Sequence, residues 1–204
     1  MTEQEKMLKG MIYDPAEPKL QHMRTCAHKL CNAYNKLNED SPKRGKILSR
    51  LLPNGNDVYL QGPVYFDYGC FTTFGKNCYA NFNLTVLDCC PVTIGDNVFF
   101  GCGVSIVTPV HPLLPAERNM YVNEQGVMTD KEYAKPIVIG SNCWIASNVT
   151  ICGGVTIGQG CVIGAGSVVT RDIPAGTFAA GNPCRVIRKL TEADSIYLNK
   201  TLWE

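Results

Sequence analysis

The sequence predicts a mainly β fold: a triangular solenoid of six-residue repeats, with a small helical segment before it and one extended loop inserted between coils. Three observations support this prediction. Residues 137–172 form six consecutive hexapeptides, IVIGSN, CWIASN, VTICGG, VTIGQG, CVIGAG and SVVTRD. The same period recurs upstream in VTIGDN, VFFGCG and VSIVTP. The chain also has 19 glycines and 12 prolines, which favour many tight turns over long helices.

The first segment, residues 1–52, lies outside the repeat and carries helical signals. Apolar side chains in LQHMRTCAHKLCNAYNKL recur three or four positions apart, which is typical of an amphipathic helix. In SPKRGKILSRLL, we expect Ser41 to be the N-cap of a further helix and Pro42 to be its first residue.

The repeat region, residues 53–190, has an aliphatic residue at the third position of each hexapeptide. A period of six fits neither an α-helix nor a hairpin meander. It fits a coil of about 18 residues with three short sides, in which each aliphatic side chain points inward and stacks on its equivalent one coil away. These positions are Ile139, Ile145, Ile151, Ile157, Ile163 and Val169.

The corners of the solenoid can also be predicted. Small residues follow the aliphatic ones, chiefly Gly140, Gly158 and Gly164, and we expect them to permit the backbone conformation of each corner. Steps of eight residues, from Phe66 to Phe74 and from Val86 to Ile94, indicate two-residue insertions at two corners.

Residues 108–136 interrupt the period with polar, turn-rich sequence. A long insertion in a regular scaffold is usually functional, so we expect the catalytic loop here. Residues 191–204 form a C-terminal tail.

Composition excludes several classes of protein. The chain has 19 Lys plus Arg against 18 Asp plus Glu, a net charge of +1, which argues against a nucleic-acid partner. No apolar run is long enough to cross a membrane and the charged start has no signal-peptide core, so we expect no membrane association and a cytoplasmic protein. The 11 cysteines contain no C-x-x-C pair, so we expect buried thiols and neither disulfides nor a metal site.

Three histidines are candidates for acid–base chemistry. His22 and His28 lie on the predicted helix, where we interpret them as solvated or packing residues. His111 opens the long insertion, and the following Pro112 restricts its backbone. His111 is therefore the candidate catalytic residue.

Several motifs around His111 resemble one family. PVYFDYG, YANFNLTVLD, TIGDN, HPLLPAERN and GNPCRVIRKL, with the leading EKMLKGMIYD, are similar to the maltose and galactoside O-acetyltransferases, including the nodulation-type sugar acetyltransferases. The resemblance implies a left-handed parallel β-helix, a homotrimer with active sites between subunits, and acetyl-CoA as co-substrate. It also implies that the N-terminal segment caps the acceptor site.

The resemblance also implies roles for individual residues. His111 matches the general base that takes the proton of an acceptor hydroxyl, a task for which imidazole is suited. Asn81 matches a residue that helps to hold the acceptor and stabilise developing charge. The other positions that match the binding of a small sugar acceptor are Asp14, Asp67, Tyr68, Gly69, Tyr79 and Glu132.

Acceptor identity stays open at this point. Asp88 is followed by Cys89 where the galactoside branch has a second acidic residue, and Asp67 replaces a serine of that branch. Both differences favour a maltose- or glucose-type acceptor.

Coenzyme binding is implied for a second set of positions. Ser147, Trp144 and Ala165 match contacts to the thioester and pantetheine end. Thr170, Arg171, Arg185 and Arg188 match the nucleotide end, where guanidinium groups can pair with phosphates.

Other functions fit the sequence less well. A non-catalytic β-helix scaffold would need neither His111 nor the arginine cluster. A carbonic anhydrase of the same architecture needs three histidines around zinc, and only His111 lies in the repeat region. Serine acetyltransferases have a longer helical domain than residues 1–52 supply. Enzymes that acetylate another small hydroxylated acceptor, such as an antibiotic, are the remaining alternative.

Overall fold

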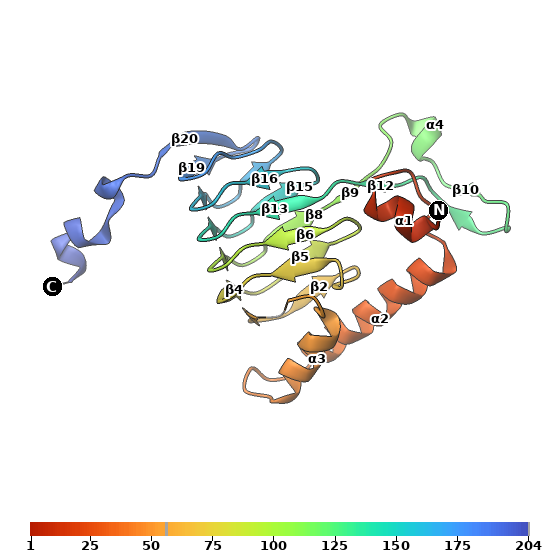
Figure 1. Cartoon of the computed structure of the whole chain (residues 1–204), viewed down its shortest axis with the longest axis horizontal. Helices are drawn as coiled ribbons and strands as arrows, with labels where there is room; N and C mark the ends of the chain where they lie inside the picture. The colour runs from red at the N-terminus through yellow and green to blue at the C-terminus, as the bar shows by residue number, and fades with distance from the viewer. Residues whose placement is uncertain (56, 204) are drawn as a thin grey trace.

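Short parallel strands stack into three faces around a core, as the sequence predicts (Figure 1). The structure is a computed structural model that describes residues 1–55 and 57–203. All pairs of strands within the three faces are parallel, except that β20 runs antiparallel to β19 at the C-terminal end.

The chain winds from face 1 to face 2 to face 3 in every coil. Face 1 contains β1 (Val58–Leu60), β4 (Cys78–Ala80), β7 (Phe99–Phe100), β14 (Trp144–Ile145), β17 (Val162–Ile163), β19 (Thr177–Ala180) and β20 (Arg185–Lys189). Face 2 contains β2 (Val64–Phe66), β5 (Leu84–Leu87), β8 (Ser105–Val107), β15 (Thr150–Cys152) and β18 (Val168–Val169). Face 3 contains β3 (Thr72–Phe74), β6 (Val92–Ile94), β13 (Ile137–Ile139) and β16 (Thr156–Ile157).

The core is the predicted column of aliphatic side chains. Each third-position residue pairs with its equivalent one coil away and is buried, which confirms the stacking predicted from the period of six. The pairs are Ile139 with Ile157, Ile145 with Ile163, and Ile151 with Val169.

The small residues at the corners act differently from the prediction. Gly140 does not have a positive φ; a Cβ added there would lie 2.5 Å from the backbone nitrogen of Gln159 on the next coil, and Gly158 is equally crowded. The left-handed conformation falls two residues later, at Asn142 (φ 61°) and Gly160 (φ 66°). Gly140 and Gly158 are therefore needed for close approach between coils rather than for the corner conformation.

Two edges of the solenoid matter for the site. We call the turns between faces 1 and 2 the asparagine edge, since they include Asn81, and the turns between faces 2 and 3 the histidine edge, since they include His111. The long turns at residues 67–71 and 88–91 accommodate the predicted two-residue insertions and lie on the histidine edge.

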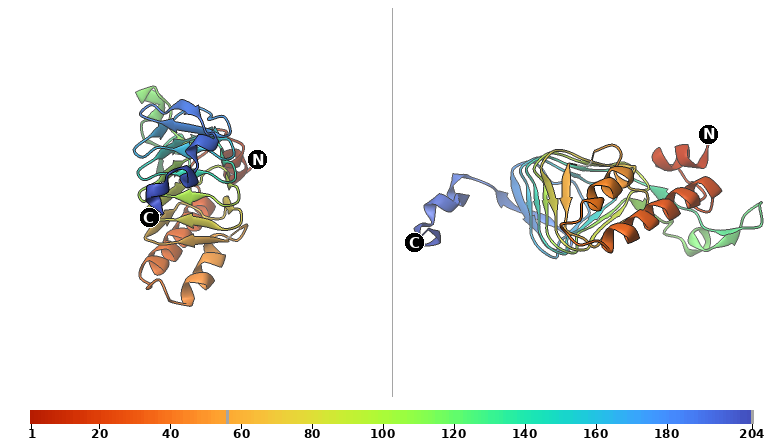
Figure 2. Two further views of the ribbon diagram at one scale, coloured as in Figure 1. Left: turned by 90° about the vertical axis from the view of Figure 1, so that its left-hand side faces the viewer. Right: turned by 90° about the horizontal axis from the view of Figure 1, so that it is seen from below.

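Three helices precede the solenoid: α1 (Glu3–Leu8), α2 (Pro18–Asn35) and α3 (Lys43–Leu51). Helix α2 packs on β2 and α3, and the two helices lie across the N-terminal end of the coils (Figure 2). The predicted cap of α3 is wrong by one position: the helix begins at Lys43 after Pro42, and the Ser41 carbonyl accepts a bond from the Arg44 amide instead.

The long insertion between β8 and β13 projects from the histidine edge (Figure 1). It contains β9 (Pro109–Val110), α4 (Pro115–Arg118), β10 (Tyr121–Val122), β11 (Met128–Thr129) and β12 (Tyr133–Ala134), with β9 paired to β12 and β10 to β11. At the opposite side of the molecule, the tail forms three short 3-10 turns that extend away from the coils (Figure 1).

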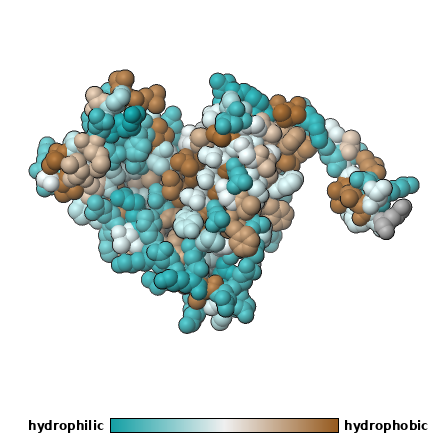
Figure 3. Space-filling view, turned by 180° about the vertical axis from the view of Figure 1, so that it is seen from behind, coloured by the Kyte–Doolittle hydropathy of each residue, from teal (hydrophilic) through white to brown (hydrophobic). Residues whose placement is uncertain are grey.

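Both projections carry exposed apolar side chains (Figure 3). Those of the insertion include Leu113, Leu114, Met120 and Val122, and those of the tail include Ile196, Tyr197, Leu198, Leu202 and Trp203. No helix in residues 1–55 and 57–203 combines the length and the apolar character that a membrane crossing needs. All 11 cysteines are free thiols and most are buried, as expected.

Candidate active site

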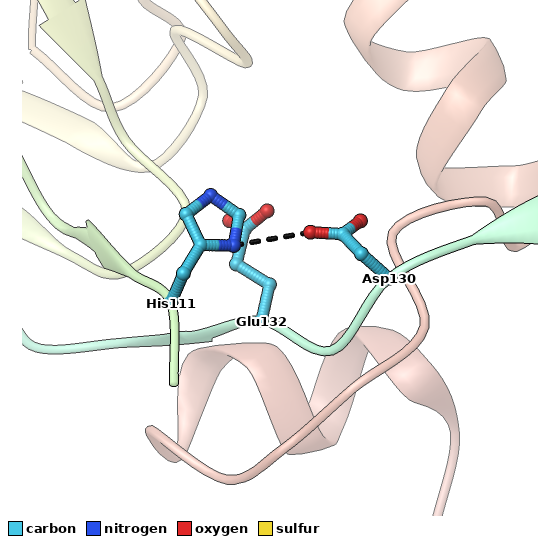
Figure 4. Close-up of side chains that lie close together, drawn as sticks. All are labelled: His111, Asp130 and Glu132. Atoms are coloured by element: carbon cyan, nitrogen blue, oxygen red, sulfur yellow. Dashed lines mark ion pairs between the residues drawn. The ribbon is translucent and has the colours of Figure 1, made fainter. Parts of the chain in front are cut away.

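His111 follows β9 on the histidine edge, and its imidazole faces a carboxylate of the same insertion (Figure 4). His111 Nδ1 lies 3.0 Å from Asp130 Oδ2. The His111 side chain is 47% exposed, whereas that of Asp130 is 22% exposed. The geometry leaves Nε2 free to face solvent while Asp130 orients the ring. Sequence reasoning missed Asp130.

Glu132 lies beside this pair (Figure 4), and one of its carboxylate oxygens is within 4.8 Å of a ring nitrogen of His111 and of a carboxylate oxygen of Asp130. Tyr13, from the N-terminal segment, donates a 2.6 Å hydrogen bond from Oη to Glu132 Oε1. Burial raises the pKa of Tyr13, and nearby Cys89 and Glu132 raise it further, so the phenol stays neutral and remains a donor.

The cluster continues along the edge to Asp67, in the turn after β2. Cys89 Sγ donates to Asp67 Oδ2 at 3.8 Å, and Cys89 packs in one buried cluster with Tyr13, the residue that donates to Glu132. Burial raises the pKa of the Cys89 thiol, so it is not available as a thiolate nucleophile. Three of the predicted site residues, Asp67, Glu132 and His111, therefore belong to one continuous cluster.

The turn that holds Asp67 is built around the buried carboxylate of Asp88. Asp88 accepts hydrogen bonds from the amides of Tyr68, Gly69 and Phe71 and from Thr72 Oγ1. Burial raises the pKa of Asp88 to about 6 in spite of these bonds. Asp88 thus fixes the shape of the corner on which the predicted acceptor residues lie.

Tyr68 and Gly69 contribute to this corner in different ways. Tyr68 is 3% exposed, and its Oη accepts a 2.8 Å bond from Arg24 of α2. Gly69 has a φ of 71°, and an added Cβ would lie 2.4 Å from the carbonyl oxygen of Leu51. The glycine is therefore required where the corner meets α3.

Asp14 links the N-terminal segment to the insertion through hydrogen bonds. Its carboxylate accepts hydrogen bonds from Thr129 Oγ1, from Asn123 Nδ2 at 2.8 Å and from the Ala16 amide. Burial acts to raise the pKa of Asp14, but the bonds from Thr129 and Asn123 outweigh it and the pKa lies below its usual value.

The other predicted residues lie elsewhere on the solenoid. Asn81 is on the asparagine edge, where its Oδ1 accepts from the Phe82 amide at 2.7 Å. Ser147 and Ala165 lie in the turns of the same edge, one and two coils from residues 101–103. Tyr79 and Trp144 belong to face 1, which leads into this edge. One chain therefore does not bring Asn81 and the predicted pantetheine contacts to His111.

The predicted nucleotide contacts are also divided. Thr170 and Arg171 are exposed on the histidine edge, after β18. Arg185 and Arg188 lie on β20, at the end of face 1. Arg188 donates hydrogen bonds from both Nη1, at 2.8 Å, and Nη2 to the carboxylate of Asp194 in the tail. These bonds, together with one from the Thr191 amide, lower the pKa of Asp194 to about 2.

His111, Asp130 and Glu132 are of the type and spacing that could hold a metal ion. In the structure, however, Asp130 already pairs with His111 and Glu132 with Tyr13.

The sequence did contain a signal for Asp130. Residues two apart on an extended segment share a side, and Asp130 precedes Glu132 by two.

Three protein-family models match segments of this chain. Residues 136–171 match the bacterial transferase hexapeptide (six repeats), residues 6–54 the maltose acetyltransferase hexapeptide capping motif, and residues 91–111 the hexapeptide repeat of succinyl-transferase. Galactoside O-acetyltransferase of Escherichia coli (strain K12) is 38% identical over 159 residues, which cover 78% of this chain and 74% of that protein.

Solved structures extend the similarity to the whole fold. A maltose O-acetyltransferase from Clostridium difficile 630 is 41% identical, with a TM-score of 0.84 over 94% of this chain and 99% of that one. This chain belongs to the maltose and galactoside O-acetyltransferase family. A galactoside acetyltransferase in complex with coenzyme A is 37% identical to this chain. Its TM-score is 0.85, and the match covers 95% of this chain and 94% of the galactoside acetyltransferase.

Membership of the family settles two points. The chain is an acetyltransferase enzyme, and its coil is the left-handed β-helix of that family. The capping motif covers residues 6–54, which include α2, α3 and the segment between α1 and α2, and it contains Tyr13 and Arg24, which bond to Glu132 and Tyr68.

Proposed function

We propose that the protein transfers an acetyl group from acetyl-CoA to a hydroxyl of a sugar, a maltose-, glucose- or galactoside-type acceptor, with His111 as general base. The observation that carries this proposal is the 3.0 Å contact between His111 Nδ1 and Asp130 Oδ2, on the edge that also presents Asp67 and Glu132. A histidine oriented through one ring nitrogen can use the other as a base.

The proton follows one route through the reaction. As the acceptor oxygen attacks the thioester carbonyl carbon, His111 Nε2 takes the hydroxyl proton, and the new C–O bond forms. The carbon–sulfur bond then breaks and the imidazolium returns the proton to the sulfur. Asp130 stabilises the imidazolium between these two transfers. No acetyl-enzyme forms, in keeping with the buried, neutral thiol of Cys89.

Acceptor hydroxyls would be held by oxygen-rich groups of the histidine edge. The Asp67 and Glu132 carboxylates accept hydrogen bonds from sugar hydroxyls. Tyr68 and Gly69 shape the corner around Asp67, and Asp14 fixes the insertion above it. Asn81 and Tyr79 would complete this site from the asparagine edge of a second subunit.

A homotrimer explains why the predicted residues lie on two edges. A threefold axis would place the histidine edge of one subunit against the asparagine edge of the next. His111 would then meet Asn81, Trp144, Ser147 and Ala165 of a neighbour, and the exposed apolar side chains of the insertion would be covered.

We expect size-exclusion chromatography with light scattering to give about three times the 22.4 kDa mass of one chain. The trimer is expected because each active site needs both edges. A monomer at micromolar concentration would contradict this arrangement.

Acetyl-CoA would lie between the two edges, with its phosphates near the basic residues. Arg185 and Arg188 are exposed on β20, where guanidinium groups can pair with phosphate oxygens. Ser147 and Ala165 would contact the pantetheine, and Thr170 and Arg171 the nucleotide.

We expect Arg185→Ala and Arg188→Ala each to raise the KM for acetyl-CoA by about five- to tenfold, because a charge-assisted phosphate contact is lost. The KM for the acceptor should change little. Lys200→Ala, which removes a positive charge from the exposed tail, is the matched control. An unchanged KM for acetyl-CoA in both arginine variants would show that these residues are only surface charges.

The proposed function is tested by an acceptor panel. Purified protein is mixed with acetyl-CoA and, in turn, glucosides, galactosides, maltose, serine and chloramphenicol, while free CoA thiol and acetylated product are measured. We expect turnover with one or more sugars. Turnover confined to chloramphenicol would instead assign the enzyme to the antibiotic-acetylating relatives.

A further inference from the structure

The first turn of the asparagine edge, between β1 and β2, lies one coil away from the turn that contains Asn81. In this first turn, the Gln61 amide donates a 2.8 Å hydrogen bond to the carbonyl oxygen of Ala80, immediately before Asn81. The Asn83 amide donates a 2.9 Å hydrogen bond in the opposite direction, to the carbonyl oxygen of Pro63. The backbone of the first turn therefore holds the turn of Asn81 from both sides.

The side chain of Gln61 connects two further polar groups. Its Nε2 donates a 2.9 Å hydrogen bond to Glu39 Oε1, in the loop between α2 and α3, and its Oε1 accepts a 2.8 Å hydrogen bond from Tyr79 Oη. An ionised carboxylate can only accept, so Glu39 determines which end of the Gln61 amide faces it. The amide oxygen is thereby turned toward Tyr79, and the phenol must be the donor in that bond.

Tyr79 is held by its ring as well as by its hydroxyl. The ring stacks on Tyr59, with centroids 6.0 Å apart and 3° between the planes, and Phe99 lies edge-on at 6.2 Å. These contacts fix the plane of the ring, and the bond to Gln61 fixes the direction of the O–H. Because the phenol proton is used in that bond, a lone pair of Tyr79 Oη remains to accept a hydrogen bond from a ligand hydroxyl.

The backbone at Gln61 is fixed separately by helices α2 and α3. Arg44 of α3 is buried, and its Nη2 donates to the carbonyl oxygens of Leu60 at 2.7 Å and of Gln61 at 2.8 Å. Tyr34 Oη of α2, also buried, donates to the same Leu60 oxygen at 2.6 Å. The position of the first turn therefore does not depend on the side chain of Gln61, which can be changed without loss of these contacts.

We propose that Gln61 is a positioning residue for the acetyl transfer: oriented by Glu39, it directs the Tyr79 hydroxyl so that the phenol oxygen accepts a hydrogen bond from the acceptor. The inference rests on the proposed function, in which Tyr79 and Asn81 complete the acceptor site of a neighbouring subunit. The side chain of Gln61 acts through Tyr79 and touches neither the acceptor nor the coenzyme.

Gln61→Met keeps the length of the side chain and removes its amide, so the Tyr79 hydroxyl loses its fixed direction. We expect the KM for the best acceptor to rise about three- to tenfold, the effect of losing one oriented hydrogen bond, with kcat and the KM for acetyl-CoA changed by less than about twofold. Gln21→Met, at an exposed position of α2, is the matched control and should equal the wild type.

A double-mutant cycle with Tyr79→Phe tests whether Gln61 acts through the phenol. Tyr79→Phe should raise the acceptor KM at least as much as Gln61→Met does. In the Tyr79→Phe background, Gln61→Met should change this KM by less than about twofold, because the hydroxyl that it directs is absent. Tyr197→Phe, at an exposed position of the tail, is the control for loss of a phenol oxygen.

An exchange of the two groups that orient each other tests the role of Glu39. Gln61→Glu places two carboxylates together and should raise the acceptor KM. Glu39→Gln/Gln61→Glu again pairs one amide donor with one carboxylate, which can still accept from Tyr79, and should return this KM to within about twofold of the wild-type value.

Thermal unfolding separates positioning from a structural role. Since Arg44 and Tyr34 hold the backbone of the first turn, the Tm of Gln61→Met should lie near that of the wild type. An unchanged acceptor KM in Gln61→Met, whatever its Tm, would overturn the inference, as would additive effects in the cycle or no recovery in the exchanged pair. Each of these results leaves sugar acetylation standing. Acetylation of non-sugar acceptors only would instead overturn the proposed function, and the same variants would then be compared with that acceptor.

Discussion

His111→Ala should lower kcat by about 10²–10⁴-fold, the usual range for loss of a positioned acid–base group. Without the imidazole, no group takes the hydroxyl proton as the acceptor attacks, and none returns it to the sulfur. Steady-state kinetics with the best sugar acceptor from the panel measures the loss. The kinetics of the wild type should show a ternary complex without ping-pong behaviour, because no acetyl-enzyme forms.

Binding and stability should separate this role from a structural one. The His111 side chain is 47% exposed and lies outside the aliphatic column, so Tm and acetyl-CoA affinity should change little. His22→Ala, at an exposed position of α2, is the matched control and should keep wild-type activity. If His111→Ala retained most activity toward every productive acceptor, His111 would not be the base.

Asp130→Asn should lower kcat by about 10²-fold and leave the KM for acetyl-CoA nearly unchanged. The substitution removes the negative charge that stabilises the imidazolium, and its amide can donate to His111 Nδ1, which would place the ring proton on Nε2. A histidine protonated on Nε2 cannot accept the hydroxyl proton. The kinetic constants of the variant, measured beside those of His111→Ala, show the size of the effect.

Two further variants distinguish orientation of the histidine from general disruption of the insertion. Asp130→Glu keeps a carboxylate and should recover part of the lost kcat, whereas Asp130→Ala should not. Glu124→Gln removes an exposed carboxylate elsewhere in the insertion and should be neutral. Equal activity of Asp130→Asn and the wild type would remove Asp130 from the mechanism.

The fold could be predicted because each coil repeats one packing rule. An aliphatic residue every six positions is the direct trace of a side chain that stacks on the previous coil, as Ile145 and Ile163 do. Gly140 is needed for another reason, because the backbone of the next coil approaches it too closely for a Cβ. A glycine that is needed for close approach cannot be distinguished in the sequence from one that is needed for a corner conformation.

The candidate site was only partly predictable, because its residues come from segments without a period. Tyr13 and Glu132 are 119 positions apart, and no local pattern links them. The division between edges did have a signal. Asn81 directly follows a strand of face 1, whereas His111 lies in the segment that leaves face 2 after β8, so their positions in the chain already place them at different corners.

Hybrid trimers test most directly the central proposal, that His111 of one subunit acts with Asn81 of the next. His111→Ala and Asn81→Ala chains are coexpressed with different affinity tags, and trimers that contain both are isolated by two successive purifications. In such a trimer, about one site in three joins an intact histidine edge to an intact asparagine edge. We therefore expect the hybrids to recover about one third of wild-type kcat per trimer, although each parent is nearly inactive. Hybrids no more active than their parents would contradict a site completed by two subunits.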